Sequence, residues 1–315
     1  MSNEYEVTFV SKLDETEQPA LFMRAADDKE PRPLLVALHT WSADLSQPWE
    51  KYRARCEARN WHCIYPLFRG PNWNRKACGS DLVVSDIESA VEYAKTICNV
   101  DEKRIYLIGG SGGGHASLLM AGRTPHIWSA VSAWCPISDV GKWHAECKAA
   151  GREYYKHIEI SCDGDPQSST SAAAQAKRRS PLTYLASAVG KTIVDIGTGI
   201  HDGHRGSVPV GHTLRAFNAL AAPEDRFTAE EINSMEQNEA VPEHLRYTGV
   251  EDPAYGPYKV LLRRTSNLVR VTIFEGGHDL LPGPGFGFLE RQSSGAAPVW
   301  NSGEVYDSEK DRLGR

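Results

Sequence analysis

The chain has 315 residues, of which 41% are hydrophobic and 24% are charged, and this composition excludes a disordered or fibrous protein. The length predicts one large domain with insertions. A net charge of −6 provides no basic surface, so we expect neither nucleic acid nor a membrane as a partner. Residues 1–30 lack the apolar stretch of a signal peptide, and no run is long enough to span a membrane. With seven cysteines and no CxxC pair, we expect a cytoplasmic protein with reduced thiols.

Strands and helices are predicted to alternate from the N-terminus onward. Residues 5–12 and 19–25 are expected to form two antiparallel strands around a polar turn. The apolar run 34–39 is typical of a strand that is buried on both faces. A polar helix, a strand and an amphipathic helix are predicted to follow, over residues 48–60, 61–68 and 81–98.

The same alternation continues through the rest of the chain. A strand over 105–108 enters a glycine run and leaves as a helix over 115–121. A short helix is expected within 181–188, and further strands are expected at residues 127–134, 191–196 and 269–274. Because strands separated by helices pair in parallel, we predict an α/β fold with a mainly parallel central sheet covered by helices on both faces.

Two stretches look inserted into this pattern, at residues 140–180 and about 223–258. Both follow strand ends on the side where open α/β sheets bind ligands, so they are either lid segments or surface decoration. We assign residues 1–292 to one catalytic domain. The tail, 293–315, is rich in glycine, serine and charge, and we expect it to be loosely packed or to form a subunit contact in a homo-oligomer.

The most informative segment is the glycine run at residues 109–114. A phosphate-binding loop would need Lys and Ser/Thr after the last glycine, but His115 and Ala116 stand there. A dinucleotide fingerprint fails as well, because its last glycine position is not a glycine here. The pattern G-x-S-x-G is matched around Ser111, and between an apolar strand and a helix it predicts a strained turn that presents a nucleophilic serine.

A serine hydroxyl needs a base, and the base needs an orienting acid. Asp202 follows the strand at 191–196, and His278 follows the strand at 269–274, in the chain order expected for this arrangement. We therefore predict Ser111, Asp202 and His278 as the catalytic residues. The rivals are the acids Asp139 and Asp195 and the bases His115, His201, His204 and His212.

The anionic intermediate needs two N–H donors. We assign them to Gly112, directly after the nucleophile, and to Trp41, with Thr40 as the next choice. Residues 201–204, His-Asp-Gly-His, also contain metal-ligand types, but no second cluster has the spacing of a known zinc enzyme, so we expect no metal and no cofactor. Tryptophans near strand ends are candidates to stack on a substrate, and these are Trp41, Trp73, Trp134 and Trp143.

With these residues in place, the chain resembles the prolyl-oligopeptidase-type branch of the α/β-hydrolases. The resemblance rests on five segments that together lie within residues 34–290: 69–70 (Arg-Gly), 104–115, 179–184 (Arg-Ser-Pro-Leu-Thr-Tyr), 208–209 (Val-Pro) and 274–278. It implies an α/β-hydrolase fold. The oligopeptidases of this branch carry an N-terminal β-propeller that screens peptide length, and we expect none here, because only about 33 residues precede the first core strand. The branch's usual His-Gly at the oxyanion strand is His39-Thr40 in this chain.

These observations predict a serine hydrolase that acts through an acyl-enzyme. The leading hypothesis is cleavage of a small-molecule carboxylic ester, with acylated carbohydrates or aryl esters as substrates suggested by the tryptophans. The alternative is a peptidase acting on short peptides, with Arg69, Arg263 and Arg264 as anchors for peptide termini. A third hypothesis is a catalytically silent hydrolase fold that serves only for binding.

Overall fold

The computed structural model describes residues 5–301, 303 and 306–307, and within them the chain folds around a nine-stranded sheet. The strand order is β1-β2-β4-β3-β5-β6-β7-β9-β8. The strands are β1 (Glu6–Val10), β2 (Glu17–Met23), β3 (Arg32–Leu38), β4 (His62–Pro66), β5 (Val100–Gly110), β6 (Ala130–Trp134), β7 (Ile193–Gly199), β8 (Val260–Ser266) and β9 (Val269–Phe274).

The middle of the sheet is parallel and its two edges are antiparallel. The pairs from β4 through β3, β5, β6 and β7 to β9 are all parallel. β1 and β2 add antiparallel strands at one edge, and β8 adds one at the other. The predicted mainly parallel sheet is therefore confirmed. β8 is missing from the prediction, because its alternating, half-buried sequence lies directly after a segment interpreted as an insertion.

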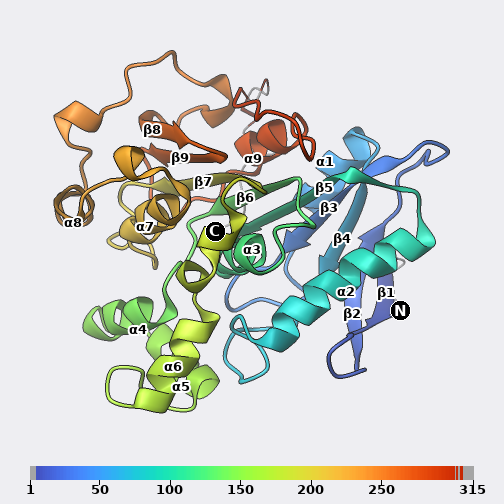
Figure 1. Cartoon of the computed structure of the whole chain (residues 1–315), viewed down its shortest axis with the longest axis horizontal. Coiled ribbons are helices and arrows are strands. Elements are labelled where there is room, and N and C mark those ends of the chain that lie inside the picture. The colour runs from blue at the N-terminus through green and yellow to red at the C-terminus, as the bar shows by residue number, and fades with distance from the viewer. Residues whose placement is uncertain (1–4, 302, 304–305, 308–315) are drawn as a thin grey trace.

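Helices cover both faces of the sheet (Figure 1). The side chains of β3 alternate between the two cores: Leu34 and Val36 face one, and Leu35 and Ala37 face the other. The first core is closed by α2 (Asp81–Ile97), α3 (Gly112–Arg123) and α7 (Gly211–Leu220), and the second by α1 (Glu50–Ala58) and α9 (Pro282–Leu289). This two-sided burial explains why the central strands are almost continuously apolar.

The predicted helix boundaries hold where a capping side chain marks them. Ser80 caps α2, its hydroxyl accepting a hydrogen bond from the Val83 N–H, and the helix ends one residue before the predicted end. The helix after the glycine run begins at Gly112 rather than at residue 115, so three glycines form its first turn. α9 is not predicted at all, because two prolines and three glycines fall within its eight residues.

The segment 140–180 forms three helices, α4 (Val140–Ala149), α5 (Tyr154–Cys162) and α6 (Thr170–Arg179). They gather on one side of the molecule in Figure 1 and share an apolar cluster with Trp41 and Val208. The segment 223–258 contains only one longer helix, α8 (Ala229–Asn238), with short 3₁₀ turns around it, at Pro223–Asp225, Glu243–Leu245 and Pro253–Tyr255. Two further 3₁₀ turns, Pro181–Thr183 and Leu185–Ala188, occupy the place of the predicted short helix.

The described part of the tail returns to the domain. The Trp300 ring stacks on Phe288, with 5.9 Å between ring centroids, and Gln292 exchanges two hydrogen bonds with the Val299 backbone. The boundary predicted at residue 292 stays a prediction, as does the use of the tail in a subunit contact. Residues 302, 304–305 and 308–315 of the tail lie outside the described residues.

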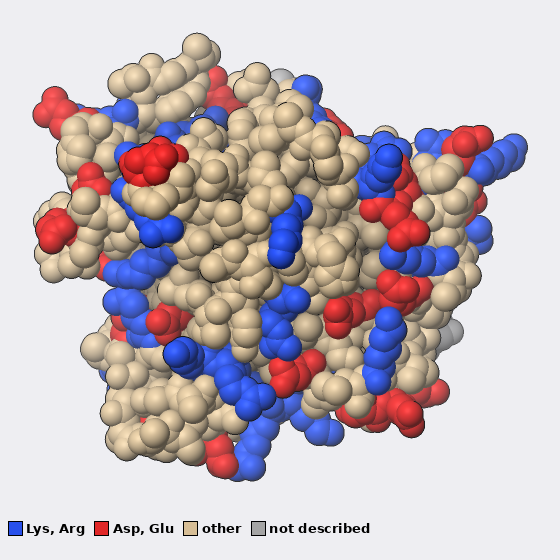
Figure 2. Space-filling view, in the orientation of Figure 1, with Lys and Arg blue, Asp and Glu red and all other residues tan. Residues whose placement is uncertain are grey.

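Basic and acidic side chains are interspersed over most of the face shown in Figure 2. Among the described residues, no helix is both long and apolar enough to cross a membrane.

His115 ties α3 to the end of α6. Its ring is buried, and Nε2 donates to the Arg179 carbonyl oxygen at 2.7 Å. Burial lowers the pKa of His115 to about 4. In the unfolded chain a histidine has its ordinary pKa near 6.5, so from pH 6.5 down to pH 4 only the unfolded state takes up this proton. The contribution of neutral His115 to stability is therefore complete above pH 6.5 and is lost as the pH falls.

We expect His115→Gln to flatten this acid loss, because glutamine keeps a donor for the Arg179 carbonyl but cannot be protonated. Between pH 7.5 and pH 5 the wild type should lose about 2 kcal/mol more unfolding free energy than the variant. Denaturant unfolding at several pH values measures this, with His126→Gln on the surface as the matched control. Equal acid losses in wild type and His115→Gln would show that His115 does not titrate in this way.

Candidate active site

Ser111 occupies the turn between β5 and α3 with a backbone that few residues adopt. Its φ is 56° and its ψ is −118°, and its N–H donates to the Trp134 carbonyl at 2.8 Å. A Cβ at Gly109 would collide with the Gly113 backbone, so only glycine fits there. The tight turn holds Ser111 at the carboxyl edge of the sheet, as the predicted nucleophile turn requires.

Trp41 lies against the first residue of α3. A Cβ at Gly112 would collide with the backbone nitrogen and Cα of Trp41, so these two backbones are in direct contact. The Gly112 N–H is at the helix N-terminus and has no intrahelical acceptor. Among the described residues, the Trp41 N–H has no acceptor either, whereas the Thr40 N–H donates to Gln47 Oε1 at 3.0 Å. Of the two predicted second donors, Trp41 therefore has the free N–H.

The Trp41 backbone and side chain are both held. The Asn72 N–H and its side-chain Nδ2 donate to the Trp41 carbonyl at 2.9 and 3.2 Å. The indole Nε1 donates to His157 Nδ1 at 3.3 Å, and the ring packs edge-on against Trp143. Because Nδ1 accepts, neutral His157 carries its proton on Nε2. Burial lowers the pKa of His157, which favours this neutral acceptor form.

The structure brings Asp202 and His278 together. His278 Nδ1 donates to Asp202 Oδ2 at 2.7 Å. The other carboxylate oxygen accepts from the N–H groups of Gly203 and Val208 at 2.9 and 3.1 Å, and Thr198 Oγ1 donates to Oδ2 at 3.3 Å. The Asp202 side chain is fully buried and that of His278 is 23% exposed. Four donors therefore stabilise the buried Asp202 carboxylate. Because this carboxylate binds Nδ1, the Nε2 atom of His278 is left to accept a proton.

Gly206 packs against both members of this pair. A Cβ at position 206 would stand 2.6 Å from the His278 Cβ and would collide with Asp202 Oδ1. The loop from Asp202 to the Val-Pro segment at 208–209 therefore folds back over the acid, and glycine is the residue that fits at position 206.

Ser111 makes no hydrogen bond to His278 within the described part of the chain. In the described structure, the hydrogen bond between Asp202 and His278 is formed, and the one between His278 and Ser111 is not. Such contacts are often long in ligand-free enzymes and shorten when substrate binds, so this geometry is compatible with the predicted order of the three residues.

The rival acids and bases have other partners. Asp195 forms a buried ion pair with Arg270 at 2.7 Å, and Asp139 caps α4. His201 lies between Glu239 and Glu275, at 2.7 and 2.6 Å. The remaining two predicted alternatives are also engaged: His204 with the Glu236 carbonyl, and His212 with Glu146 and Ser138.

Arg69 is not placed to bind substrate. Its guanidinium pairs with Asp14 at 2.8 Å and Asp86 at 2.7 Å, and its side chain is only 5% exposed. All three guanidinium nitrogen atoms donate to these two carboxylates, and this indicates a structural role for Arg69. The proposed anchors Arg263 and Arg264 are engaged as well, by Asp252 and by the Asp225 carbonyl.

Trp134 has a different role from the one predicted. Its ring is buried beneath Gly197 and packs against Tyr255 and Phe274, and its Nε1 donates to Ser132 Oγ at 2.9 Å. No face of this indole is left for a substrate. The part of Trp134 that serves the site is its carbonyl, which accepts the Ser111 N–H.

Trp73 is the tryptophan that remains exposed. It is 40% exposed and its ring lies 5.0 Å from that of His157, whereas Trp41 and Trp143 are buried. Substrate stacking on Trp73 stays a prediction. Sequence reasoning missed His157, since nothing in the polar helix α5 marks a histidine that would reach the Trp41 indole.

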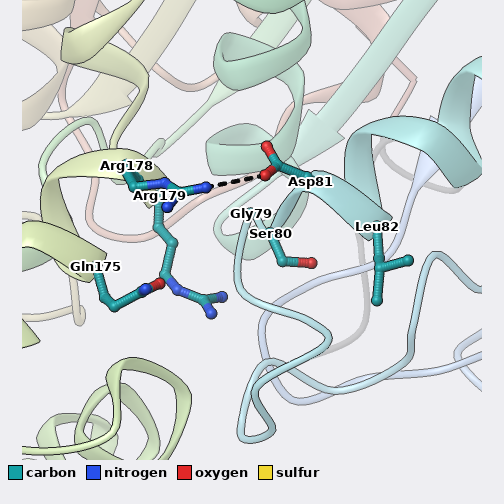
Figure 3. Close-up of a pocket in the computed structure, with 7 residues that line it drawn as sticks. All are labelled: Gly79, Ser80, Asp81, Leu82, Gln175, Arg178 and Arg179. Carbon is teal, nitrogen blue, oxygen red and sulfur yellow. Dashed lines mark hydrogen bonds and ion pairs between the residues drawn. The ribbon is translucent and has the colours of Figure 1, made fainter. Parts of the chain in front are cut away.

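A pocket between α6 and the N-terminus of α2 lies outside this cluster (Figure 3). Arg178 points across it toward Asp81, and the two form an ion pair at 3.1 Å. Arg179 donates to the carbonyls of Ala77 and Cys78, and the Cys78 N–H in turn donates to Asn72 Oδ1. The pocket wall thus supports the loop that carries Asn72 and, through it, Trp41.

Two groups of three side chains have the types and spacing of metal ligands among the described residues. One is Cys135, Asp202 and His278. The other is His144, Glu159 and Asp165, where the Lys148 ammonium already lies 2.6 Å from Asp165 and 3.5 Å from Glu159. The prediction of no metal stays untested.

The model of the prolyl oligopeptidase family matches residues 69–250, which is more than half of the chain. A search of curated protein sequences finds no match. Among solved structures, acylaminoacyl peptidase from Pyrococcus horikoshii is similar, with 14% identity and a TM-score of 0.59 over 87% of this chain and 37% of that chain. A puromycin-hydrolyzing peptidase from Mycobacterium tuberculosis has 16% identity and a TM-score of 0.56, over 75% of this chain and 38% of that one.

Prolyl oligopeptidase B from Galerina marginata is similar at 16% identity with a TM-score of 0.54, over 68% of this chain and 31% of that chain. At these identities the structures show the shared fold alone. This chain spans a little over a third, or less, of the length of each of the three proteins.

We expect Gly206→Ala to lower kcat by about 100-fold or more, because the added methyl group displaces the Asp202–His278 pair and small misplacements are costly. The measurement is turnover together with labelling by a fluorophosphonate probe. Gly141→Ala is the matched control, since a Cβ there makes only ordinary contacts, the closest at 3.5 Å. Unchanged kcat in a folded Gly206→Ala protein would contradict the role given to this contact.

We expect Arg69→Met to cost about 3–5 kcal/mol of unfolding free energy, because it leaves the Asp86 carboxylate buried without its cation. Arg75→Met, at an exposed ion pair with Asp163, should cost about 1 kcal/mol or less. Denaturant unfolding compares the two. A raised KM for Arg69→Met with unchanged stability would instead restore Arg69 as a substrate-binding residue.

Proposed function

Because the chain belongs to the prolyl oligopeptidase family, we propose that it is a serine peptidase that cleaves short peptides. The observation that carries the proposal is the Asp202–His278 hydrogen bond at the sheet edge that also presents Ser111, in a chain of this family. The fold is an α/β-hydrolase fold, and hydrolysis by a serine nucleophile is the chemistry that this family supports.

In the proposed reaction, His278 Nε2 accepts the Ser111 proton as Oγ attacks the scissile carbonyl. The developing oxyanion accepts hydrogen bonds from the N–H groups of Gly112 and Trp41, each worth about 3–4 kcal/mol of barrier. His278 then gives its proton to the departing amine, and water hydrolyses the acyl-enzyme by the reverse path. Asp202 keeps the ring oriented and stabilises its protonated form.

A recessed nucleophile supports a preference for short or extended peptides. Ser111 is only 9% exposed, so a folded protein surface cannot reach it. The helices α4 to α6 stand over the acid loop: Trp143 Nε1 donates to the Ser207 carbonyl, and Arg152 donates to the Gly203 carbonyl. A thin chain or a chain end fits such a site better than a broad surface does.

Family membership reverses the order of the two hypotheses drawn from the sequence, because it favours peptide over ester substrates. The preference for sugar or aryl esters rested on four tryptophans near strand ends, and three of these, Trp41, Trp134 and Trp143, are buried. The same nucleophile would still cleave an activated ester, since a phenolate needs less help to leave than an amine does. Such esters are therefore useful reporters of Ser111.

The cytoplasmic location and the homo-oligomer remain proposals. In support of a reducing compartment, all seven cysteines are free thiols in the structure.

The test is release of naphthylamine from short aminoacyl- and peptidyl-naphthylamides, compared with turnover of short p-nitrophenyl esters. We expect the wild type to cleave both, and Ser111→Ala to lose about 10⁴-fold or more of each activity. Ser117→Ala in the same helix is the matched control.

Ester turnover without any amide cleavage across the peptide series would return ester hydrolysis to first place. Failure of a fluorophosphonate to label Ser111 in folded protein would favour a fold used only for binding.

A further inference from the structure

Cys135 directly follows β6, and its thiol lies beside the Asp202–His278 pair. Cys135 Sγ, a carboxylate oxygen of Asp202 and a ring nitrogen of His278 all lie within 4.8 Å of one another. The Cys135 side chain is fully buried. Neither the proposed reaction nor the family relationship gives this thiol a task.

Hydrogen bonds hold the Cys135 thiol in place. Thr198 Oγ1 lies 3.5 Å from Cys135 Sγ and 3.3 Å from Asp202 Oδ2, so one hydroxyl bridges the thiol and the acid. Cys135 Sγ donates to the carbonyl of Asp279 at 3.4 Å, and Asp279 directly follows His278 in the sequence. The Cys135 backbone is fixed as well, since its N–H donates to the Gly197 carbonyl at 2.8 Å.

We propose that Cys135, Asp202 and His278 form an inhibitory site for a thiophilic divalent cation such as Zn²⁺. This inference rests on the proposed function, because it concerns the same histidine. Thiolate, imidazole and carboxylate are the three ligand types that zinc prefers, and a water molecule completes a tetrahedral set. The His278 side chain is 23% exposed, so of the three ligand residues it is the one that solvent reaches.

The three ligand atoms must shift to hold the ion, and the thiol, which lies within 4.8 Å of both partners, must approach them by up to about 1.2 Å. Tetrahedral zinc with nitrogen and oxygen ligands places those atoms about 3.3 Å apart, and the thiolate about 3.6 Å from either. His278 Nδ1 and Asp202 Oδ2 are 2.7 Å apart, so the pair must open by about half an ångström. The exposed ring is the member that can move, because Asp202 is fixed by backbone N–H groups.

The ion would stop catalysis by changing the tautomer of His278. Zinc can bind the Nδ1 lone pair only after the Nδ1 proton has passed to solvent. Nε2 then takes up a proton from solvent, so the neutral ring carries its proton on Nε2. The thiol proton passes to solvent as the Zn–S bond forms. An Nε2 that already carries a proton cannot accept one from Ser111, so the nucleophile is not activated.

The second three-residue group in the described structure is a poorer zinc site. At His144, Glu159 and Asp165 the Lys148 ammonium already supplies the positive charge. That group also lacks a thiolate. We therefore expect a thiophilic cation to bind at Cys135, Asp202 and His278 rather than at the second group.

The experiment measures zinc binding and activity on the whole chain. Wild-type protein is titrated with Zn²⁺ during naphthylamide cleavage, and reversal by a chelator is checked. Each variant is compared with its own metal-free rate. Cys135→Ser should raise the zinc concentration for half-inhibition by about 100-fold or more, since even residues that only support a ligand are worth about 10–100-fold. Cys147→Ser, at another buried thiol, should leave the midpoint unchanged.

Cobalt(II) provides a readout that does not depend on turnover. Bound to wild type and to Cys147→Ser, it should give a thiolate-to-cobalt charge-transfer band that Cys135→Ser and Cys135→Ala lack. If no peptide is cleaved but this band appears and Zn²⁺ slows fluorophosphonate labelling of Ser111, the proposed function fails and the metal site stands. Peptide cleavage that Zn²⁺ inhibits equally in Cys135→Ser, or a wild type without the cobalt band, would overturn the site.

Discussion

The site depends on how closely backbones approach one another at the start of α3. A Cβ at Gly113 would collide with the region of the Leu38 carbonyl, and one at Gly114 would stand 2.6 Å from the Trp134 carbonyl. Together with Gly112 against Trp41, these contacts bring the ends of β3, β5 and β6 to one point. Because no side chain can separate the strands there, Ser111 and the Trp41 N–H lie close together. The chemistry proposed for Ser111 requires that proximity.

The helices α4 to α6 are part of the same packing unit. Trp143 contacts Trp41 on the oxyanion side and reaches the Ser207 carbonyl on the acid side. His212 on α7 adds a hydrogen bond to Glu146 on α4. The segment interpreted from sequence as a lid or as decoration therefore connects the two halves of the candidate site. Whether it opens for substrate stays a prediction, but any opening must break these contacts.

Patterns with a strict local cause were predictable from the sequence. The central strands follow from continuous apolar runs, and the Ser111 turn follows from glycines that the backbone contacts demand. The proximity of Asp202 and His278 was predictable because parallel strands place their carboxyl ends at one edge. The buried surroundings of Arg69 and Trp134 were not predictable, since sequence alone does not show which ion pair or core cavity takes a side chain. Asp14 and Asp86 are 55 and 17 residues away from Arg69.

Asp202 is a buried acid, and the orientation of His278 depends on the groups that stabilise this acid. A carboxylate without solvent is stable only if donors replace the lost water, and Asp202 obtains them from its own loop, from Thr198 and from the imidazole. This loop can close tightly only because position 206 carries no side chain. Cys135, directly after β6, lies beside this acid as well. The buried Asp202 carboxylate, which orients His278 in the proposed reaction, therefore also lies beside the Cys135 thiol. The arrangement proposed for proton transfer from Ser111 is thus close to the one proposed for binding a metal ion.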